Sequence, residues 1–181
     1  DNKMLVLIAA VKKEAAEQRL KLLEEAGLRA NIIDLDAIAL TNGFNYISAA
    51  DDFLRQKAYA LLDVGASVAS LAILEAGALV LSRDIHIAGN AITQKIMDAF
   101  GVDFKAAEQL KKGIPVDGAT FEDARPVLHA MTENVLLEIS KTFDFFKATA
   151  AADQIDRIMV SGGASRVDGF HEMLQHHFSA P

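Results

Sequence analysis

The chain has 181 residues, of which 51% are hydrophobic, enough for a globular protein with a substantial core. Its formal net charge of −7 leaves no broad basic surface, which argues against sequence-independent binding of nucleic acid. Disulfide bonds and thiolate metal sites are excluded because the sequence contains no cysteine, and this favours a reducing compartment such as the cytoplasm. No apolar run reaches the roughly 20 residues of a membrane-spanning helix, so direct membrane insertion is not predicted.

The N-terminal part of the chain begins with a strand and a helix. The sequence MLVLIAA at residues 4–10 is typical of a buried strand. Residues 14–26 carry apolar side chains at helical spacing, and Gly27 follows them, as is common at helix ends. We expect further residues before this segment in the natural protein, because the chain starts at Asp1 and reaches a buried strand at once.

A second strand is expected from about residue 30, followed by a short helix that begins near Asp34 or Asp36. The two strands and two helices form a β-α-β-α unit, which is typical of a parallel pair of strands covered by helices. We assign residues 1–55 to this first, partial subdomain.

The second subdomain is assigned to residues 56–181. It begins with short apolar segments separated by glycine turns, which predict an antiparallel meander at residues 58–64, 68–74 and 78–82. Helical spacing follows, with a break at Gly101, and then a long amphipathic helix, a strand, a glycine turn and a final helix. We interpret residues 90–125 as a small insertion.

The turn after the first strand of the meander carries Asp63, Gly65 and Ser67. Glycine lets the backbone approach a ligand, and the N–H groups of such a turn can bind an anion. Asp63 could then hold a hydrated Mg²⁺ beside a phosphate. The same residues also fit a simple hairpin in which the aspartate bonds to the turn backbone.

A second glycine turn, Gly162 and Gly163, follows the last strand, and Arg166 comes three residues later. Bare backbone leaves room for a planar group, and a guanidinium can stack on an aromatic base. The spacing does not match the dinucleotide-binding glycine fingerprint. An ordinary strand-to-helix turn is the alternative.

Glu108 and Lys111 lie three residues apart on a predicted helix and therefore face the same side. This spacing fits a surface ion pair, or a site in which the carboxylate accepts from ribose hydroxyls while the lysine covers a base. The spacing of His171, His176 and His177 does not favour a zinc site. No catalytic triad or carboxylate pair can be defended from spacing, so no catalytic residue is assigned.

The order of these motifs resembles the second half of proteins of the actin, Hsp70 and sugar-kinase superfamily. Within it, the chain is similar to the PilM family, the FtsA-related actin-like proteins of type IV pilus assembly. The resemblance is carried by VLIAAVKKEAAEQRLKLLEEAGLRANIIDLDAIAL, ALLDVGASVASLAILEAGALVLSRDIHIAGNAIT and IDRIMVSGGASRVDGF. It implies a partial actin-like (ribonuclease H-like) α/β fold, with mixed sheets flanked by helices.

The resemblance also implies a ligand, ATP or ADP with Mg²⁺, held between two loops. The metal would be bound by Asp63 through water. The nucleotide-binding residues implied are Asp63, Gly65, Ala66, Ser67, Gly89, Glu108, Lys111, Gly162, Gly163, Ala164 and Arg166. In the superfamily, a strand turn that precedes these segments supplies another phosphate loop, so nucleotide affinity is expected to be weak or absent in this chain.

The implied function is a nucleotide-binding scaffold on the cytoplasmic side of a pilus machine, at the inner face of the inner membrane. Its expected partners are a PilN-like cytoplasmic tail, the pilus motor ATPase and possible further copies of itself. Two alternatives stay open: a weak ATPase, and a nucleotide-free interaction domain like the cytoplasmic part of the type II secretion protein GspL.

Overall fold

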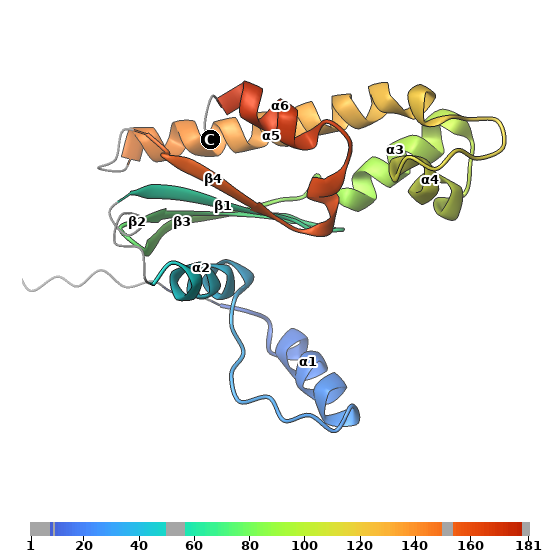
Figure 1. The fold of residues 1–181 in the computed structure, drawn as a ribbon. Coiled ribbons are helices and arrows are strands. Elements are labelled where there is room, and N and C mark those ends of the chain that lie inside the picture. Colours follow the sequence, from blue (N-terminus) through green and yellow to red (C-terminus); the bar gives the residue numbers. More distant parts are fainter. Residues whose placement is uncertain (1–7, 9, 50–56, 150–153, 179–181) are drawn as a thin grey trace, which may run out of the picture. The chain divides into compact units, whose positions relative to one another are not determined.

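The structure, a computed structural model, describes residues 8, 10–49, 57–149 and 154–178 (Figure 1). The chain divides into two compact units, Asp1–Leu35 and Asp36–Pro181, and each is described by itself. The predicted strand at residues 4–10 lies largely outside the described residues, as does the predicted subdomain boundary near residue 55, which stays a prediction. None of the helices in the described ranges is long and apolar enough to cross a membrane.

The first unit contains helix α1 (Lys13–Glu25), which confirms the predicted helix. Gly27 follows it in the left-handed region, with φ of 73°. The strand predicted from residue 30 is wrong, because residues 28–35 have no regular structure. A strand is stabilised by a hydrogen-bonded neighbour, and nothing in the described ranges pairs with this segment, where Ile32 is 84% exposed.

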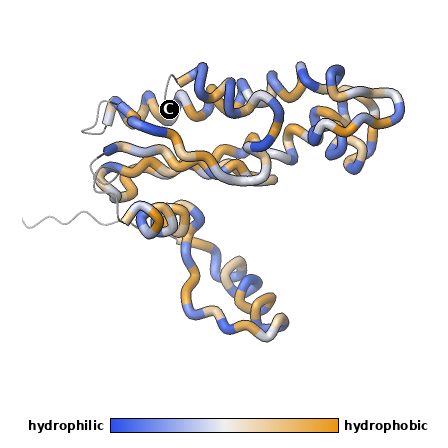
Figure 2. The backbone as a smooth tube through the Cα atoms, viewed as in Figure 1, coloured by the Kyte–Doolittle hydropathy of each residue, from blue (hydrophilic) through white to orange (hydrophobic). Residues whose placement is uncertain are grey.

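The second unit is built on a mixed sheet of four strands in the order β3-β2-β1-β4. Strands β1 (Ala58–Val64), β2 (Ala69–Glu75) and β3 (Ala78–Ile85) form the predicted antiparallel meander. Strand β4 (Arg157–Ser161) returns parallel to β1. β1 and β2 are buried on both faces and therefore have continuous apolar sequences, which Figure 2 shows as orange stretches along the sheet.

Helices cover both faces of this sheet (Figure 1). Helices α5 (Phe121–Thr149) and α6 (Phe170–Phe178) pack on one face around a core that includes Leu62, Ile139 and Phe146. On the other face, helix α2 (Asp36–Ile47) brings Phe44 against Tyr59, with ring centroids 5.3 Å apart. The mixed, helix-flanked sheet predicted from the sequence is therefore present.

A second hydrophobic core lies beyond the end of the sheet. Helices α3 (Gly89–Phe100) and α4 (Phe104–Lys111) pack there against the first half of α5. Gly101 ends α3 with φ of 63°, and the Asp103 side chain caps α4 by accepting from the N–H of Ala106 at 2.8 Å. The break predicted at Gly101 is confirmed, and so is the long helix that follows.

The carboxyl ends of β1 and β4 approach each other closely at Gly162. This residue has φ of 90°, and a Cβ atom on it would lie 2.4 Å from the carbonyl oxygen of Val64. Only glycine fits such a contact with backbone. The loop after β4 is thereby held against the end of β1, next to the turn at residues 65–67.

We predict that Gly162→Ala lowers the free energy of unfolding by about 3 kcal/mol or more, because it combines a strained φ with a backbone clash. The measurement is urea unfolding followed by circular dichroism. Gly43→Ala is the control, because a Cβ atom at this position within α2 meets nothing within 4 Å. It should stabilise the protein by about 0.5–1 kcal/mol. Equal urea midpoints for Gly162→Ala and Gly43→Ala would contradict the close approach of Gly162 to the Val64 backbone.

Candidate functional site

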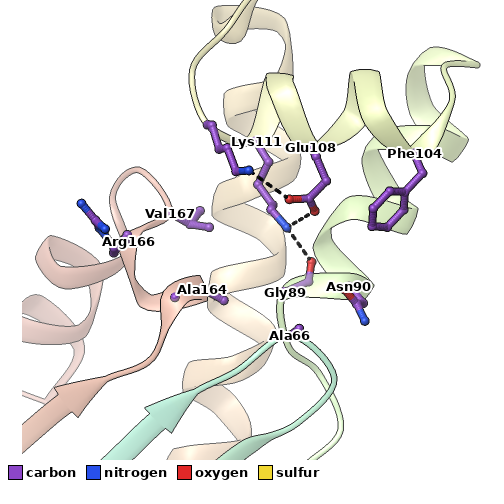
Figure 3. A pocket seen from close by; sticks show the side chains of 11 residues that line it. Ala66, Gly89, Asn90, Phe104, Glu108, Lys111, Ala164, Arg166 and Val167 are labelled. Atoms are coloured by element: carbon purple, nitrogen blue, oxygen red, sulfur yellow. Dashed lines mark hydrogen bonds and ion pairs between the residues drawn. The ribbon is translucent and has the colours of Figure 1, made fainter. Parts of the chain in front are cut away.

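A cavity of about 350 Å³ lies where the sheet meets the second core (Figure 3). Four segments form its walls: the turn after β1, the start of α3, helix α4, and the short helix η2 (Gly163–Arg166) after β4. These segments are far apart in the sequence. The lining residues are Ala66, Gly89, Asn90, Phe104, Glu108, Lys111, Lys112, Gly163, Ala164, Arg166 and Val167.

Most of the residues predicted to bind nucleotide contribute to this lining. Four predicted residues do not: Gly65, Ser67 and Gly162, which are adjacent to lining residues in the two loops, and Asp63, which lies near the end of β1. The structure therefore brings both glycine loops and the α4 pair to one place. Their role in binding stays a prediction.

The turn after β1 is tied to the start of α3 by backbone hydrogen bonds. The N–H of Gly89 donates to the carbonyl of Gly65 at 3.1 Å, and the N–H of Asn90 donates to that of Ala66 at 2.6 Å. The Asn90 side chain also donates to Ser67 Oγ at 3.2 Å. Within the described ranges, the N–H groups of Ala66 and Ser67 have no acceptor. They are the turn's available donors for an anion.

Two glycines in this region allow close packing. A Cβ atom on Gly65 would lie 2.8 Å from the carbonyl oxygen of Val68, with which the Gly65 N–H is bonded. A Cβ atom on Gly89 would lie 3.2 Å from Cβ of Ala164 and 3.3 Å from the carbonyl oxygen of Gly65. The start of α3 is therefore packed tightly between the two loops.

Asp63 has a structural partner, because Ser161 Oγ donates to its Oδ1 at 2.7 Å. The two residues are also paired in register across β1 and β4. The bond fixes one carboxylate oxygen, while the other has no partner in the described part of the chain. One oxygen of Asp63 thus accepts the hydrogen bond from Ser161 on β4, and the other can bind a hydrated cation.

The α4 wall contains a partly buried ion pair. Lys111 Nζ donates to the carboxylate of Glu108, to Thr93 Oγ1 at 2.7 Å and to the carbonyl oxygen of Gly89 at 3.2 Å. The Thr93 hydroxyl also contacts Glu108 Oε1. Only 11% of the Lys111 side chain and 23% of the Glu108 side chain are exposed. Figure 3 shows both side chains facing the cavity.

Opposing effects set the pKa of Glu108. Burial raises the pKa. Hydrogen bonds from Lys111 and Thr93, together with the charges of Lys111 and Lys112, lower it, and their combined effect is larger than that of burial. The net result is a pKa below its ordinary value of 4.5. Glu108 is therefore an anion at neutral pH and can accept hydrogen bonds but not donate them.

Arg166 ends η2 and is exposed, with no hydrogen-bond partner in the described part of the chain. In Figure 3 its guanidinium points away from Lys111. The loop before it is shaped by Ser165 Oγ, which donates to the carbonyl oxygen of Gly162 at 2.7 Å. Arg166 is thus a free cation at the cavity edge, whereas Lys111 is fully engaged.

The sequence analysis missed four lining residues: Asn90, Phe104, Lys112 and Val167. Three of them had a signal, since Asn90, Lys112 and Val167 directly follow predicted residues. Phe104 lies one helical turn before Glu108 on the same face. The three histidines of α6 form no metal cluster in the described ranges.

Comparisons with known proteins show the family and the fold of this chain. The profile of a family described as type IV pilus assembly protein PilM matches residues 1–181. A chain of the solved PilM–PilN type IV pilus biogenesis complex has a TM-score of 0.78 and 21% identity. The match covers 93% of this chain and 46% of that one. The chain therefore spans about half the length of that relative.

Two further solved structures are similar over most of the chain. MreB5 of Spiroplasma citri bound to AMPPNP has a TM-score of 0.65 and 17% identity, over 94% of this chain and 59% of its own. Ta0583, an archaeal actin homolog in complex with ADP, has a TM-score of 0.61 and 17% identity, over 83% and 50%. The fold is therefore actin-like, as predicted.

We predict that Glu108→Gln reduces the loss of stability in acid. Because the folded-state pKa lies below 4.5, the stabilisation by Glu108 is complete above that pH and is lost as pH falls through the lowered value. The measurement is the free energy of unfolding at about pH 6 and about pH 3.

The difference between wild type and variant isolates Glu108 from other carboxylates. Hydrogen bonds from Thr120 lower the pKa of Asp123, and a hydrogen bond from Lys141 lowers that of Glu138, so both also respond to acid. They are present in both proteins and cancel. An identical pH dependence in wild type and Glu108→Gln would refute the prediction.

Proposed function

The chain belongs to the family of type IV pilus assembly protein PilM, and from this premise we propose that it is a nucleotide-binding scaffold of a pilus assembly machine. One observation carries the proposal: two glycine loops nearly a hundred residues apart border one cavity together with the Glu108–Lys111 pair. The volume of this cavity is in the range of small-molecule sites.

The proposed ligand is ATP or ADP with Mg²⁺. The free N–H groups of Ala66 and Ser67 suit a phosphate, and Asp63 suits a hydrated Mg²⁺ beside it. Glu108 is ionised and suits the hydroxyls of a ribose. Two structural neighbours were solved with AMPPNP and with ADP bound, which supports this choice.

The base would lie against the loop after β4. Gly163 presents bare backbone there, since nothing lies within 4 Å of where its Cβ would be. Arg166 is free to stack on an aromatic ring through its guanidinium face. The predicted residues thus divide among the phosphate, sugar and base of one nucleotide.

The proposed role is assembly, not turnover. The solved neighbour is a PilM–PilN complex, and we propose a PilN-like tail as a partner of this chain, at the cytoplasmic face of the inner membrane. The motor ATPase and further copies of the chain remain proposed partners. Nucleotide would set how far the subdomains close, and closure would set which surface binds a partner. In this proposal residues 56–181 form the nucleotide-binding subdomain, with the insertion at 90–125, and residues 1–55 belong to the first.

We predict that ATP with Mg²⁺ binds the full-length protein and raises its melting temperature. Arg166→Ala should weaken binding about fivefold, as expected for loss of roughly 1 kcal/mol of stacking. Isothermal titration calorimetry measures the affinity. Arg157→Ala is the control, because this exposed arginine on β4 is not part of the cavity. Absence of any ATP effect on wild type would favour the nucleotide-free interaction domain.

We predict that Asp63→Asn removes the Mg²⁺ dependence of ATP binding while the protein stays folded. The asparagine oxygen can still accept from Ser161, so the strand contact is retained, whereas the charge that attracts the cation is lost. The experiment compares ATP affinity with and without Mg²⁺ for both proteins. An unchanged Mg²⁺ effect in the variant would exclude Asp63 from the metal site.

A further inference from the structure

We propose that Thr93 is a positioning residue that aims Glu108 at the sugar of a bound nucleotide. This inference rests on the nucleotide-binding function proposed above. Thr93 is fully buried in α3 and does not line the cavity, so it acts only through its neighbours. Its hydroxyl lies within hydrogen-bond distance of Glu108 Oε1, Lys111 Nζ and the carbonyl oxygen of Gly89.

A count of protons assigns the direction of each bond. A hydroxyl has one proton to donate, and an ionised carboxylate is a stronger acceptor than a carbonyl. Thr93 therefore donates to Glu108 Oε1 and accepts from Lys111 Nζ at 2.7 Å. The carbonyl oxygen of Gly89 then accepts a hydrogen bond from Lys111 Nζ at 3.2 Å.

This assignment leaves one atom of the cluster free for a ligand. The three N–H groups of Lys111 are taken by Glu108, Thr93 and Gly89. Glu108 Oε1 receives two donors, whereas Oε2 has only Lys112 Nζ at 3.8 Å, beyond hydrogen-bond distance. Oε2 is therefore the acceptor that the wall offers to sugar hydroxyls.

Thr93 and Lys111 together determine that Oε2 and not Oε1 is free. Without the hydroxyl, Oε1 loses a donor and one N–H of Lys111 loses its acceptor. The carboxylate can then rotate, and the free lysine proton competes with the sugar for it. Recognition of the sugar hydroxyls should weaken even if the nucleotide still binds.

The test is sugar selectivity, measured as the ratio of affinities for ATP and 2′,3′-dideoxy-ATP by calorimetry on the intact protein. Wild type should prefer ATP. Thr93→Val, which keeps the shape and removes the hydroxyl, should reduce that preference about fivefold or more. Thr93→Ser should restore it. A role in packing alone would leave the ratio unchanged in all three proteins.

Thr132→Val is the matched control. Thr132 is also buried in a helix, but its hydroxyl has no hydrogen-bond partner in the described part of the chain. Thr93→Val should lower the urea midpoint, whereas Thr132→Val should leave it unchanged or raise it. Thr93→Ala provides a second variant without the hydroxyl if valine does not fold.

The outcomes separate this inference from the proposed function. If wild type binds neither nucleotide, the proposed function fails, and the sugar-positioning role of Thr93 fails with it. If wild type prefers ATP and Thr93→Val or Thr93→Ala keeps the same preference, Thr93 has no positioning role. Equal urea midpoints for Thr93→Val and Thr132→Val would also overturn the inference.

Discussion

The parallel pairing of β1 with β4, closed by Gly162 against Val64, is the contact on which the site depends. The two strands are separated by almost a hundred residues, yet their carboxyl ends leave the sheet side by side. Each end continues into a glycine loop. The convergence of the loops is therefore a consequence of strand pairing, and a side chain at residue 162 would disturb both together.

The start of α3 turns this convergence into a cavity. Its first N–H groups bond to the turn after β1, and Gly89 packs against Ala164 of the other loop. The carbonyl of the same glycine accepts from Lys111 on α4. Gly89 thus contacts the turn after β1, the loop after β4 and helix α4. The positions of the two loops therefore depend on the same residue as the position of the ion pair.

Much of the fold could be predicted from the sequence because its signals are local. Continuous apolar runs predicted β1 and β2, which are buried on both faces, and Gly101 predicted the break between α3 and α4. The prediction of a strand from residue 30 was wrong because it also rested on a local signal alone. Its apolar residues satisfy the local pattern, but a strand also requires a partner, which a short window cannot reveal.

The site was only partly predictable. Motif order and resemblance indicated Asp63, Glu108 and Arg166, but nothing in the sequence distinguishes Thr93 from an ordinary buried threonine. Its importance comes from contacts with Glu108 and Lys111, which are 15 and 18 residues away and on another helix. The sequence signal of Thr132 is similar, yet its hydroxyl meets no partner in the described part of the chain.

Helix α5 contributes to both hydrophobic cores, with Leu128 in one and Ile139 in the other. Its 29 residues, with Pro126 near the start, form one helix that extends over about 43 Å. A mechanical load applied at the α3–α4 end would reach the sheet along the backbone hydrogen bonds of one helix, with no loop between them to stretch. Within this unit the two cores should thus resist tension as one stiff body.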